Sequence, residues 1–199
     1  MQPRAAHHVG PNAILQTVEA VQALAGQGAL TRVCRAAAMP GLVGNLPHAM
    51  VPAQDALRLH QAVARTLPGP LAGQVARDAG RRTGDYILAH RIPAPARVLL
   101  RLMPGRLAGP VLLKAIGHHA WTFAGDAEVT CIRRPELELV VRDNPLALPG
   151  CPWHRAVLER LFQRLVDPGV RVEHTACCAI DGSECRFVFH AASVPYRGG

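Results

Sequence analysis

Apolar positions recur every three or four residues through most of the chain up to residue 125, which is the spacing of amphipathic helices. Glycines and prolines interrupt this pattern, most clearly at 26–28, 40–52 and 104–105. The predicted helices cover residues 12–25, 31–39, 53–67, 71–90, 97–103 and 107–121. This part of the chain, residues 9–125, is therefore predicted to be mainly helical.

From residue 126 the pattern changes to short apolar runs, which are typical of strands. The predicted strands cover residues 128–133, 137–142, 170–180 and 184–190, with a helix at 152–166 between the two pairs. Turns at Pro135 and at Asp181-Gly182 join the strands of each pair. We therefore predict the α+β class: one domain over 1–199, in which a β-β-α-β-β unit with an antiparallel sheet (126–191) follows the helical part.

The composition is that of a folded protein, because 49% of the 199 residues are hydrophobic and only 18% are charged. The longest apolar stretch, residues 107–125, is broken by Lys114, His118 and His119, which argues against a membrane span. The first ten residues contain no apolar segment typical of a secretory signal. We expect a cytoplasmic protein, with a peripheral contact to the membrane left open.

The net charge of +8 favours acidic partners such as nucleic acid, anionic lipid headgroups or ligands with carboxylates. Lys114 is the only lysine, and the arginines are spread along the chain instead of forming one block. No helix-turn-helix and no interleaving of aromatic and basic residues is visible, so nucleic acid is not an expected partner.

Six cysteines in a chain without a visible export signal favour metal or thiol chemistry over a disulfide framework. Cys151 precedes the helix at 152–166, whose dipole is expected to lower the pKa of the thiol. Cys177 and Cys185 are expected on the two strands of the last hairpin. Adjacent strand residues face opposite sides, so Cys178 is not expected to join the same site. Zinc takes four ligands. The candidates are Cys151, Cys177 and Cys185, with either His174 or Glu173 as the fourth ligand. His154 is a further candidate for that position.

Several segments resemble the bacteriochlorophyll 4-vinyl reductase family of photosynthetic bacteria. These are GPNAILQ at 10–16, GRRTGDYILAHRIP at 80–93, HAWTFAG at 119–125, WHRAVLERLF at 153–162, EHTACCA at 173–179 and CRF at 185–187. The resemblance extends from about residue 9 to 190. It implies a role in bacteriochlorophyll and photosynthesis-related pigment synthesis, with an oxidoreductase activity that reduces a ring vinyl group of a chlorophyllide precursor to ethyl.

The C-terminal half is also similar to the wider 4-vinyl-reductase domain family. That family includes the sensor domains of aromatic-responsive transcription activators, and its fold is similar to vesicle-tethering TRAPP subunits. The resemblance implies an internal pocket for a small apolar ligand and a structural zinc ion. Its cysteine ligands fall on Cys151, Cys177 and Cys185, whereas the position of the family's glutamate ligand is occupied here by His174.

The implied reduction needs a source of electrons, yet no nicotinamide or flavin motif is visible. The nearest glycine string, Gly26-Gln27-Gly28, lies between helices and lacks a third glycine. We therefore predict a protein that binds a divinyl chlorophyllide-type tetrapyrrole and delivers it to a pathway enzyme such as a chelatase or methyltransferase. Catalytic vinyl reduction is the alternative, and a small-ligand sensor or regulatory domain is the second alternative. A homodimer is left open.

Six residues are candidate contacts for the pigment, because a chlorophyllide presents a flat apolar ring, a magnesium ion and a carboxylate. Arg82, Tyr86 and His90 step by four along one predicted helix and could form a polar stripe. His118, His119 and Trp121 gather at the end of the next long helix, where a histidine could face the ring metal.

Overall fold

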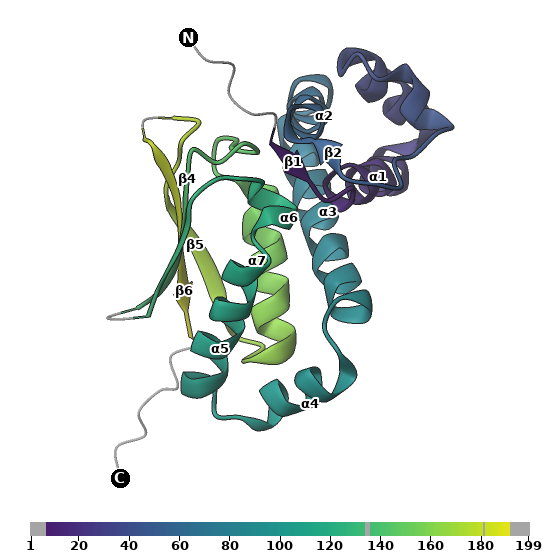
Figure 1. Cartoon of the computed structure of the whole chain (residues 1–199). Helices are drawn as coiled ribbons and strands as arrows, with labels where there is room; N and C mark the ends of the chain where they lie inside the picture. Colours follow the sequence, from purple (N-terminus) through teal and green to yellow (C-terminus); the bar gives the residue numbers. More distant parts are fainter. Residues whose placement is uncertain (1–6, 134–135, 181, 192–199) are drawn as a thin grey trace.

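The structure, a computed structural model, describes residues 7–133, 136–180 and 182–191 (Figure 1). The predicted turn residues Pro135 and Asp181 lie outside the described residues. The helices are α1 (Asn12–Ala36), the short 3-10 helix η1 (Pro40–Val43), α2 (Ala53–Thr66), α3 (Gly69–His90), α4 (Ala94–Leu102), α5 (Gly105–His118), α6 (Trp121–Ala124) and α7 (Pro152–Leu165). The strands are β1 (His8–Val9), β2 (Val51–Pro52), β3 (Val129–Ile132), β4 (Leu137–Arg142), β5 (Arg171–Ala176) and β6 (Glu184–His190).

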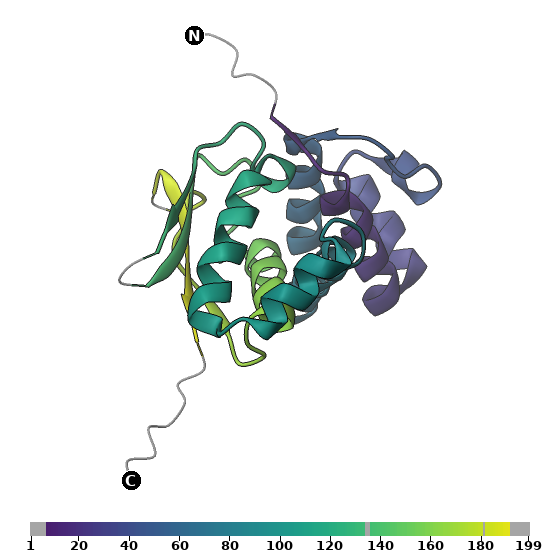
Figure 2. The same cartoon turned by 60° about the horizontal axis from the view of Figure 1, so that its bottom comes forward.

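The main sheet has the strand order β3-β4-β6-β5, and every neighbouring pair is antiparallel. Helices α5 and α7 cover one face of this sheet, α3 packs behind α7, and α1 and α2 lie on the far side of α3 (Figures 1 and 2). The two-residue strands β1 and β2 form a separate antiparallel pair. The predicted α+β class and the antiparallel β-β-α-β-β order are confirmed.

Several predicted elements differ from the structure in their bounds. Helix α4 begins at Ala94, three residues before the predicted start at 97, and the helix predicted at 107–121 is divided into α5, which ends at His118, and α6, which begins at Trp121. The helices predicted at 12–25 and 31–39 both lie in α1, which ends at Ala36, and the predicted break between them is confirmed by the non-helical conformation of Gly26, whose φ is 81°. The predicted loop at 40–52 contains η1 and β2. Strand β5 ends at Ala176, four residues before the predicted end at 180, because the chain turns there. Within the described part of the chain, no helix is both long enough and apolar enough to cross a membrane.

Helices α3 and α7 approach each other closely through glycines of α3. A Cβ atom on Gly80 would lie 2.5 Å from the carbonyl oxygen of Trp153 and 2.7 Å from the Cβ atom of Ala156. On Gly84 it would lie 2.9 Å from the side chain of Arg160. Real carbon atoms do not approach so closely, so any larger residue would push α7 away. These glycines therefore fix the position of the N-terminal end of α7.

The other side of α7 is held against the sheet by aromatic and aliphatic side chains. Phe162 of α7 and Phe187 of β6 are almost completely buried, and the rings of Phe162 and Phe189 lie 4.2 Å apart. Leu139 of β4 is also fully buried. Burial of large apolar side chains is the main stabilising contribution to such packing. The start of α7 is thereby placed beside the beginning of β6, where Cys185 lies.

Candidate functional site

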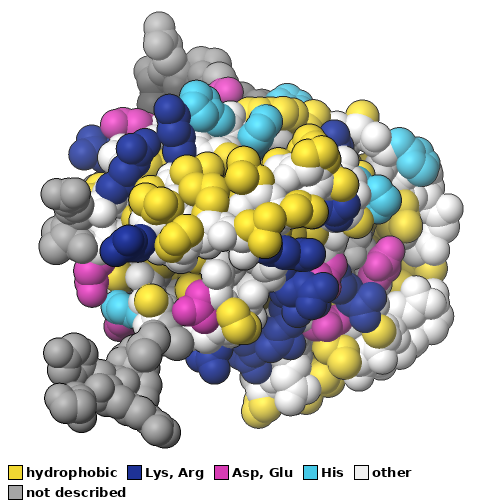
Figure 3. Space-filling model, turned by 90° about the horizontal axis from the view of Figure 1, so that it is seen from below, with side chains coloured by type: hydrophobic (Ala, Val, Ile, Leu, Met, Phe, Trp, Pro, Cys, Tyr) yellow, Lys and Arg dark blue, Asp and Glu magenta, His cyan; other side chains and the backbone are white. Residues whose placement is uncertain are grey.

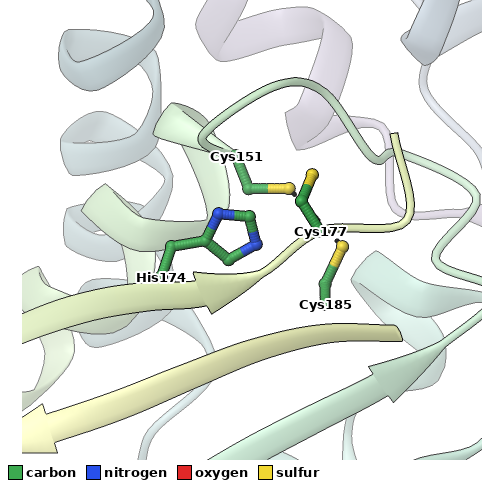
Figure 4. A group of neighbouring side chains, drawn as sticks. All are labelled: Cys151, His174, Cys177 and Cys185. Atoms are coloured by element: carbon green, nitrogen blue, oxygen red, sulfur yellow. Dashed lines mark hydrogen bonds between the residues drawn. The ribbon is translucent and has the colours of Figure 1, made fainter. Parts of the chain in front are cut away.

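Four side chains from different parts of the C-terminal half converge in one cluster, consisting of Cys151, His174, Cys177 and Cys185 (Figure 4). One ligand atom from each residue lies within 4.8 Å of the corresponding atoms of all the others. The three cysteines are buried and His174 is half-buried. The structure thus brings together the three predicted cysteines and His174.

Two local features of the backbone aim these side chains at one another. Cys151 precedes α7 in the left-handed conformation, with φ 38° and ψ 52°, and Pro152 begins the helix. A register shift between His174 and Ala176 in β5 gives this strand one extra residue opposite β6. Such a bulge bends a strand and redirects the residues that follow. Cys177 consequently lies in the turn after β5, so its predicted position on a strand is wrong.

The geometry of the cluster fits a tetrahedral metal ion. The sulfur atoms of Cys151 and Cys185 lie 3.7 Å apart, and two thiolates on one zinc ion at about 2.3 Å are separated by about 3.8 Å. The Nε2 atom of His174 is buried without a hydrogen-bond partner, which is costly unless another group, such as a cation, satisfies it. Three cysteines and one histidine are a common ligand set for structural zinc, and they could hold that ion here.

The other two ligands left open by the sequence lie outside this cluster. Glu173 points to the opposite side of β5 and its carboxylate lies 3.0 Å from Nε2 of His190. His154 is buried on α7, where its ring packs against Trp153 with a centroid distance of 4.9 Å. His174 is therefore the residue that completes the group of four.

Cys178 lies closer to the cluster than expected. Its sulfur atom is 3.5 Å from that of Cys185. The expectation that neighbouring cysteines face opposite sides assumed a continuous strand, and that assumption is wrong because β5 ends before Cys177. Cys178 therefore lies beside the four candidate ligands.

The thiols of Cys151 and Cys185 form a coupled pair. The hydrogen bond with Cys185 and burial raise the pKa of Cys151, whereas the same hydrogen bond lowers the pKa of Cys185. The two thiols therefore titrate as a pair, and the expected lowering of the pKa of Cys151 by the helix start stays a prediction. A metal ion binds thiolates, so an ion bound by Cys151 and Cys185 would displace the proton between their sulfur atoms.

An apolar cavity of about 280 Å³ lies between α1, α2, α3 and the residues that lead into α7. His60 and Trp153 line it, with their ring centroids 5.6 Å apart. The Nε2 atom of His60 lies 2.9 Å from the carbonyl oxygen of Ala13 and 3.0 Å from Oγ1 of Thr17. Burial lowers the pKa of His60, so the ring is neutral at pH 7. A neutral ring that donates from Nε2 to Ala13 keeps a lone pair on Nδ1.

A polar groove of about 560 Å³ adjoins the cavity, and the two share Pro149 and Pro152. Its charged side chains are Arg77, Arg81, Arg155, Arg160, Arg171 and Glu159. Arg160 is engaged by Asp85, and Arg155 and Arg171 share Glu159. Arg77 and Arg81 are exposed and form no ion pair with another described residue. The groove is therefore electropositive and suits carboxylate or phosphate groups.

The six pigment contacts predicted from sequence lie elsewhere on the described surface. Arg82 pairs with Asp78 and Glu19, and the rings of Tyr86 and His90 lie 4.7 Å apart on α3. His118, His119 and Trp121 are exposed near the end of α5. None of the six lines the cavity or the groove. No bound ligand tests these positions, and they stay predictions.

Sequence reasoning missed the residues that do line the cavity and the groove. The spacing of Arg77 and Arg81 on one helix was a usable signal, since residues four apart share a helix face. Nothing in the sequence indicated that His60 of α2, Thr17 of α1 and Trp153 of α7 would meet, because these contacts join distant parts of the chain.

Two curated relatives are similar to the chain over almost its entire length. The bacteriochlorophyll synthase 23 kDa chain of Cereibacter sphaeroides is 42% identical over 191 residues, covering 93% of this chain and 91% of the relative. The protein of the same name from Rhodobacter capsulatus is 40% identical, with 92% and 86% covered. The chain belongs to the bacteriochlorophyll synthase 23 kDa chain family. The predicted association with bacteriochlorophyll biosynthesis is thereby confirmed at the level of the family, whereas vinyl reduction stays a prediction. No protein-family model matches the chain.

Solved structures relate the fold of this 23 kDa chain family member to H-NOX proteins. The unliganded Fe(II) H-NOX protein of K. algicida superposes with a TM-score of 0.64 at 10% identity, over 94% of this chain and 99% of the other. The H-NOX protein of S. oneidensis in the Fe(II)NO ligation state gives a TM-score of 0.54 at 12% identity, over 92% and 98%. At such low identity the likeness concerns the fold alone. The predicted similarity to TRAPP subunits stays a prediction.

Proposed function

We propose that this chain binds a chlorophyllide-type tetrapyrrole and delivers it to an enzyme of bacteriochlorophyll synthesis, such as a chelatase or methyltransferase. Family membership supports the pathway. The ligand class rests on one observation: an apolar cavity that contains a neutral histidine adjoins a groove lined by arginines. This combination suits a ligand with an apolar ring, a central magnesium ion and a peripheral carboxylate.

The apolar cavity and the polar groove each match a different part of such a ligand. The apolar walls beside Trp153 suit the macrocycle, and the unprotonated Nδ1 atom of His60 could bind the magnesium ion. Arg77 and Arg81, which have no acidic partner among the described residues, suit the carboxylate. Arginine binds carboxylates through two parallel hydrogen bonds.

The size of the cavity favours delivery over catalysis. Its volume of about 280 Å³ lies just below the range, about 300–1,000 Å³, of pockets that enclose most of a small ligand. A macrocycle would enter by one edge and leave the remainder accessible to a receiving enzyme. Vinyl reduction is the alternative; it adds two electrons and two protons, and the sequence offers no motif for a nicotinamide or flavin donor.

We also propose that the cluster of Cys151, His174, Cys177 and Cys185 holds a structural zinc ion. Four protein ligands leave no open position for a substrate, so the ion would supply stability and no reaction step. The site would fix the turn after β5 and the start of β6 to the residues that lead into α7. Because Pro149 and Pro152 lie within two residues of Cys151, the same ion would hold the mouth of the cavity in place.

Absorption spectroscopy with purified chlorophyllide tests the proposal. We expect the unmodified chain to shift the pigment spectrum in a saturable manner. Ala76→Phe, which fills the cavity, should weaken binding at least about tenfold, whereas Ala89→Phe on the exposed part of the same helix should not. Arg77→Glu with Arg81→Glu should also weaken binding, and Arg35→Glu with Arg65→Glu, two exposed arginines elsewhere, should leave it unchanged.

The results separate the three candidate functions. A spectral shift without conversion of divinyl to monovinyl pigment, even after a reductant such as NADPH is added, supports delivery. Conversion of the vinyl group with turnover would establish catalysis instead. Binding of small aromatic compounds without any affinity for chlorophyllide would contradict both and favour a sensor domain.

A further inference from the structure

The end of the molecule formed by α4 and α5 exposes large apolar side chains that the fold does not use. They are Val98, Leu99, Leu102, Leu107 and Val111, with exposed fractions of 54%, 60%, 78%, 52% and 50%. We call these five residues the apolar crest. Soluble proteins rarely gather so many exposed apolar side chains unless the surface contacts something.

The crest consists of one face of each helix. Leu102 lies three positions after Leu99 and four after Val98 on α4, and Leu107 and Val111 are four apart on α5, so each set projects from one side. The opposite faces are buried, as Leu100, Leu112 and Leu113 show. The crest therefore lies on two amphipathic helices, of which α5 buries several side chains and α4 buries Leu100.

Hydrogen bonds hold α4 in this position. The Nε atom of Arg101 donates to the carbonyl oxygen of Arg164 at 3.1 Å, which ties α4 to the end of α7. Arg97 donates to the carbonyl oxygen of Leu88 at 2.7 Å, which ties α4 to α3. The crest is thus presented by a helix that is fixed to the rest of the fold.

The segment of the chain that carries the crest has charges of one sign. Between Asp85 and Asp126 the sequence contains no aspartate or glutamate, while its cations are Arg91, Arg97, Arg101, Arg106 and Lys114. Figure 3 looks onto this end and shows hydrophobic side chains with Lys and Arg side chains on either side, and with fewer Asp and Glu side chains among and beyond these. The surface combines exposed apolar groups with a positive border.

We propose that the crest inserts into the headgroup region of a membrane that contains anionic lipids. Amphipathic helices bind such surfaces by burying their apolar face, and nearby cations are attracted to the anionic headgroups. A second copy of the chain fits less well, because a symmetric contact would bring the two positive borders against each other. This inference goes beyond pigment binding and does not depend on it.

Co-sedimentation with vesicles tests the inference. One set of vesicles contains phosphatidylcholine alone, and in the other about a third of the lipid is phosphatidylglycerol. We expect binding to the anionic vesicles that weakens as salt is raised, and much weaker binding to the neutral ones. Leu99→Ser with Leu102→Ser should reduce the bound fraction at least about tenfold. Arg106→Glu with Lys114→Glu should also reduce it.

Matched variants control for general effects. Leu24→Ser with Val43→Ser removes exposed apolar side chains from α1 and η1, and Arg35→Glu with Arg65→Glu reverses exposed charges elsewhere. Both should bind vesicles like the unmodified chain, and circular dichroism shows whether each variant is folded. Equal vesicle binding by the crest variants would overturn the inference. Dimerisation that Leu99→Ser with Leu102→Ser abolishes, without any vesicle binding by the unmodified chain, would instead assign the crest to self-association.

Discussion

At the scale of single residues, the environment of His174 favours a bound metal ion. Its ring stacks on Phe187 at a centroid distance of 4.8 Å, which fixes its orientation, and its Nε2 atom is buried without a hydrogen bond. An unsatisfied buried polar atom costs about 1–3 kcal/mol. A metal bond to Nε2 would remove this cost.

Replacement of one candidate ligand should therefore remove the metal and stability together. We expect Cys177→Ser to lower the zinc content from about one ion per chain to well under half, and the melting temperature by about 5–10 °C. Cys131→Ser is the control, because Cys131 is half-buried and its sulfur donates to the carbonyl oxygen of Leu113 instead of joining the cluster. Elemental analysis and calorimetry measure both quantities. Full zinc content in Cys177→Ser would count against the site.

The buried histidines make stability depend on pH. Burial lowers the pKa of His60, and burial also lowers the pKa of His154 to about 4. Below the ordinary histidine pKa of about 6.5, the unfolded chain therefore binds protons that the folded chain does not, and stability falls as pH decreases.

His60→Gln should reduce this pH dependence, because glutamine does not titrate. We expect the free energy of unfolding to fall less in this variant than in the unmodified chain between about pH 7.5 and about pH 5.5. His48→Gln, at an exposed position, should behave like the unmodified chain. Urea unfolding at the two pH values measures the difference, and an identical pH dependence in His60→Gln would contradict the expectation.

At the scale of elements, the close contact between α3 and α7 is the feature most sensitive to substitution. Gly80→Ala would place a methyl group 2.5 Å from the carbonyl oxygen of Trp153. Overpacking of this kind costs about 1–3 kcal/mol, and here it would move the start of α7. Gly28→Ala is the control, because it lies on an exposed part of α1 where only the end of a flexible arginine is near. Chemical denaturation should show destabilisation by Gly80→Ala alone.

Some elements were predictable because their pattern is local. Strands β4 and β6 begin and end where the short apolar runs predict, and the predicted ends of α2 and α7 differ from the structure by one residue. The glycines at 26–28 predict the break that the structure has as a kink at Gly26. The bulge in β5 has no signal in composition, because it depends on the pairing with β6.

The site was predictable to the extent that its residue types are distinctive. Cysteines and a histidine near one hairpin indicate a metal, and the structure places four of them together. Lining residues such as Thr17, His60 and Trp153 are ordinary residues of ordinary helices. Their meeting depends on how α1, α2 and α3 pack around the start of α7, which a single sequence does not reveal.

At the scale of the whole molecule, the proposed metal and the proposed ligand should be coupled. The cluster includes Cys151, and the nearby Pro149 and Pro152 line both the apolar cavity and the polar groove. We expect a zinc chelator such as 1,10-phenanthroline to lower both the melting temperature and the affinity for chlorophyllide, and added zinc to restore both. Spectral titration before and after chelation measures the coupling. Loss of zinc with unchanged pigment affinity would show that the two sites are independent.

The backbone at Cys151 has one more consequence. A residue other than glycine pays about 1–2 kcal/mol for the left-handed conformation, and Cys151 adopts it with φ 38°. Glycine would remove that penalty but has no sulfur, and alanine would lose the sulfur and keep the penalty. Without metal, the Cys151→Gly chain should therefore unfold at a higher urea concentration than the Cys151→Ala chain. A lineage that no longer needed the ion would be expected to drift toward glycine at this position, so the amino acid found there in distant relatives would report whether they still use the metal.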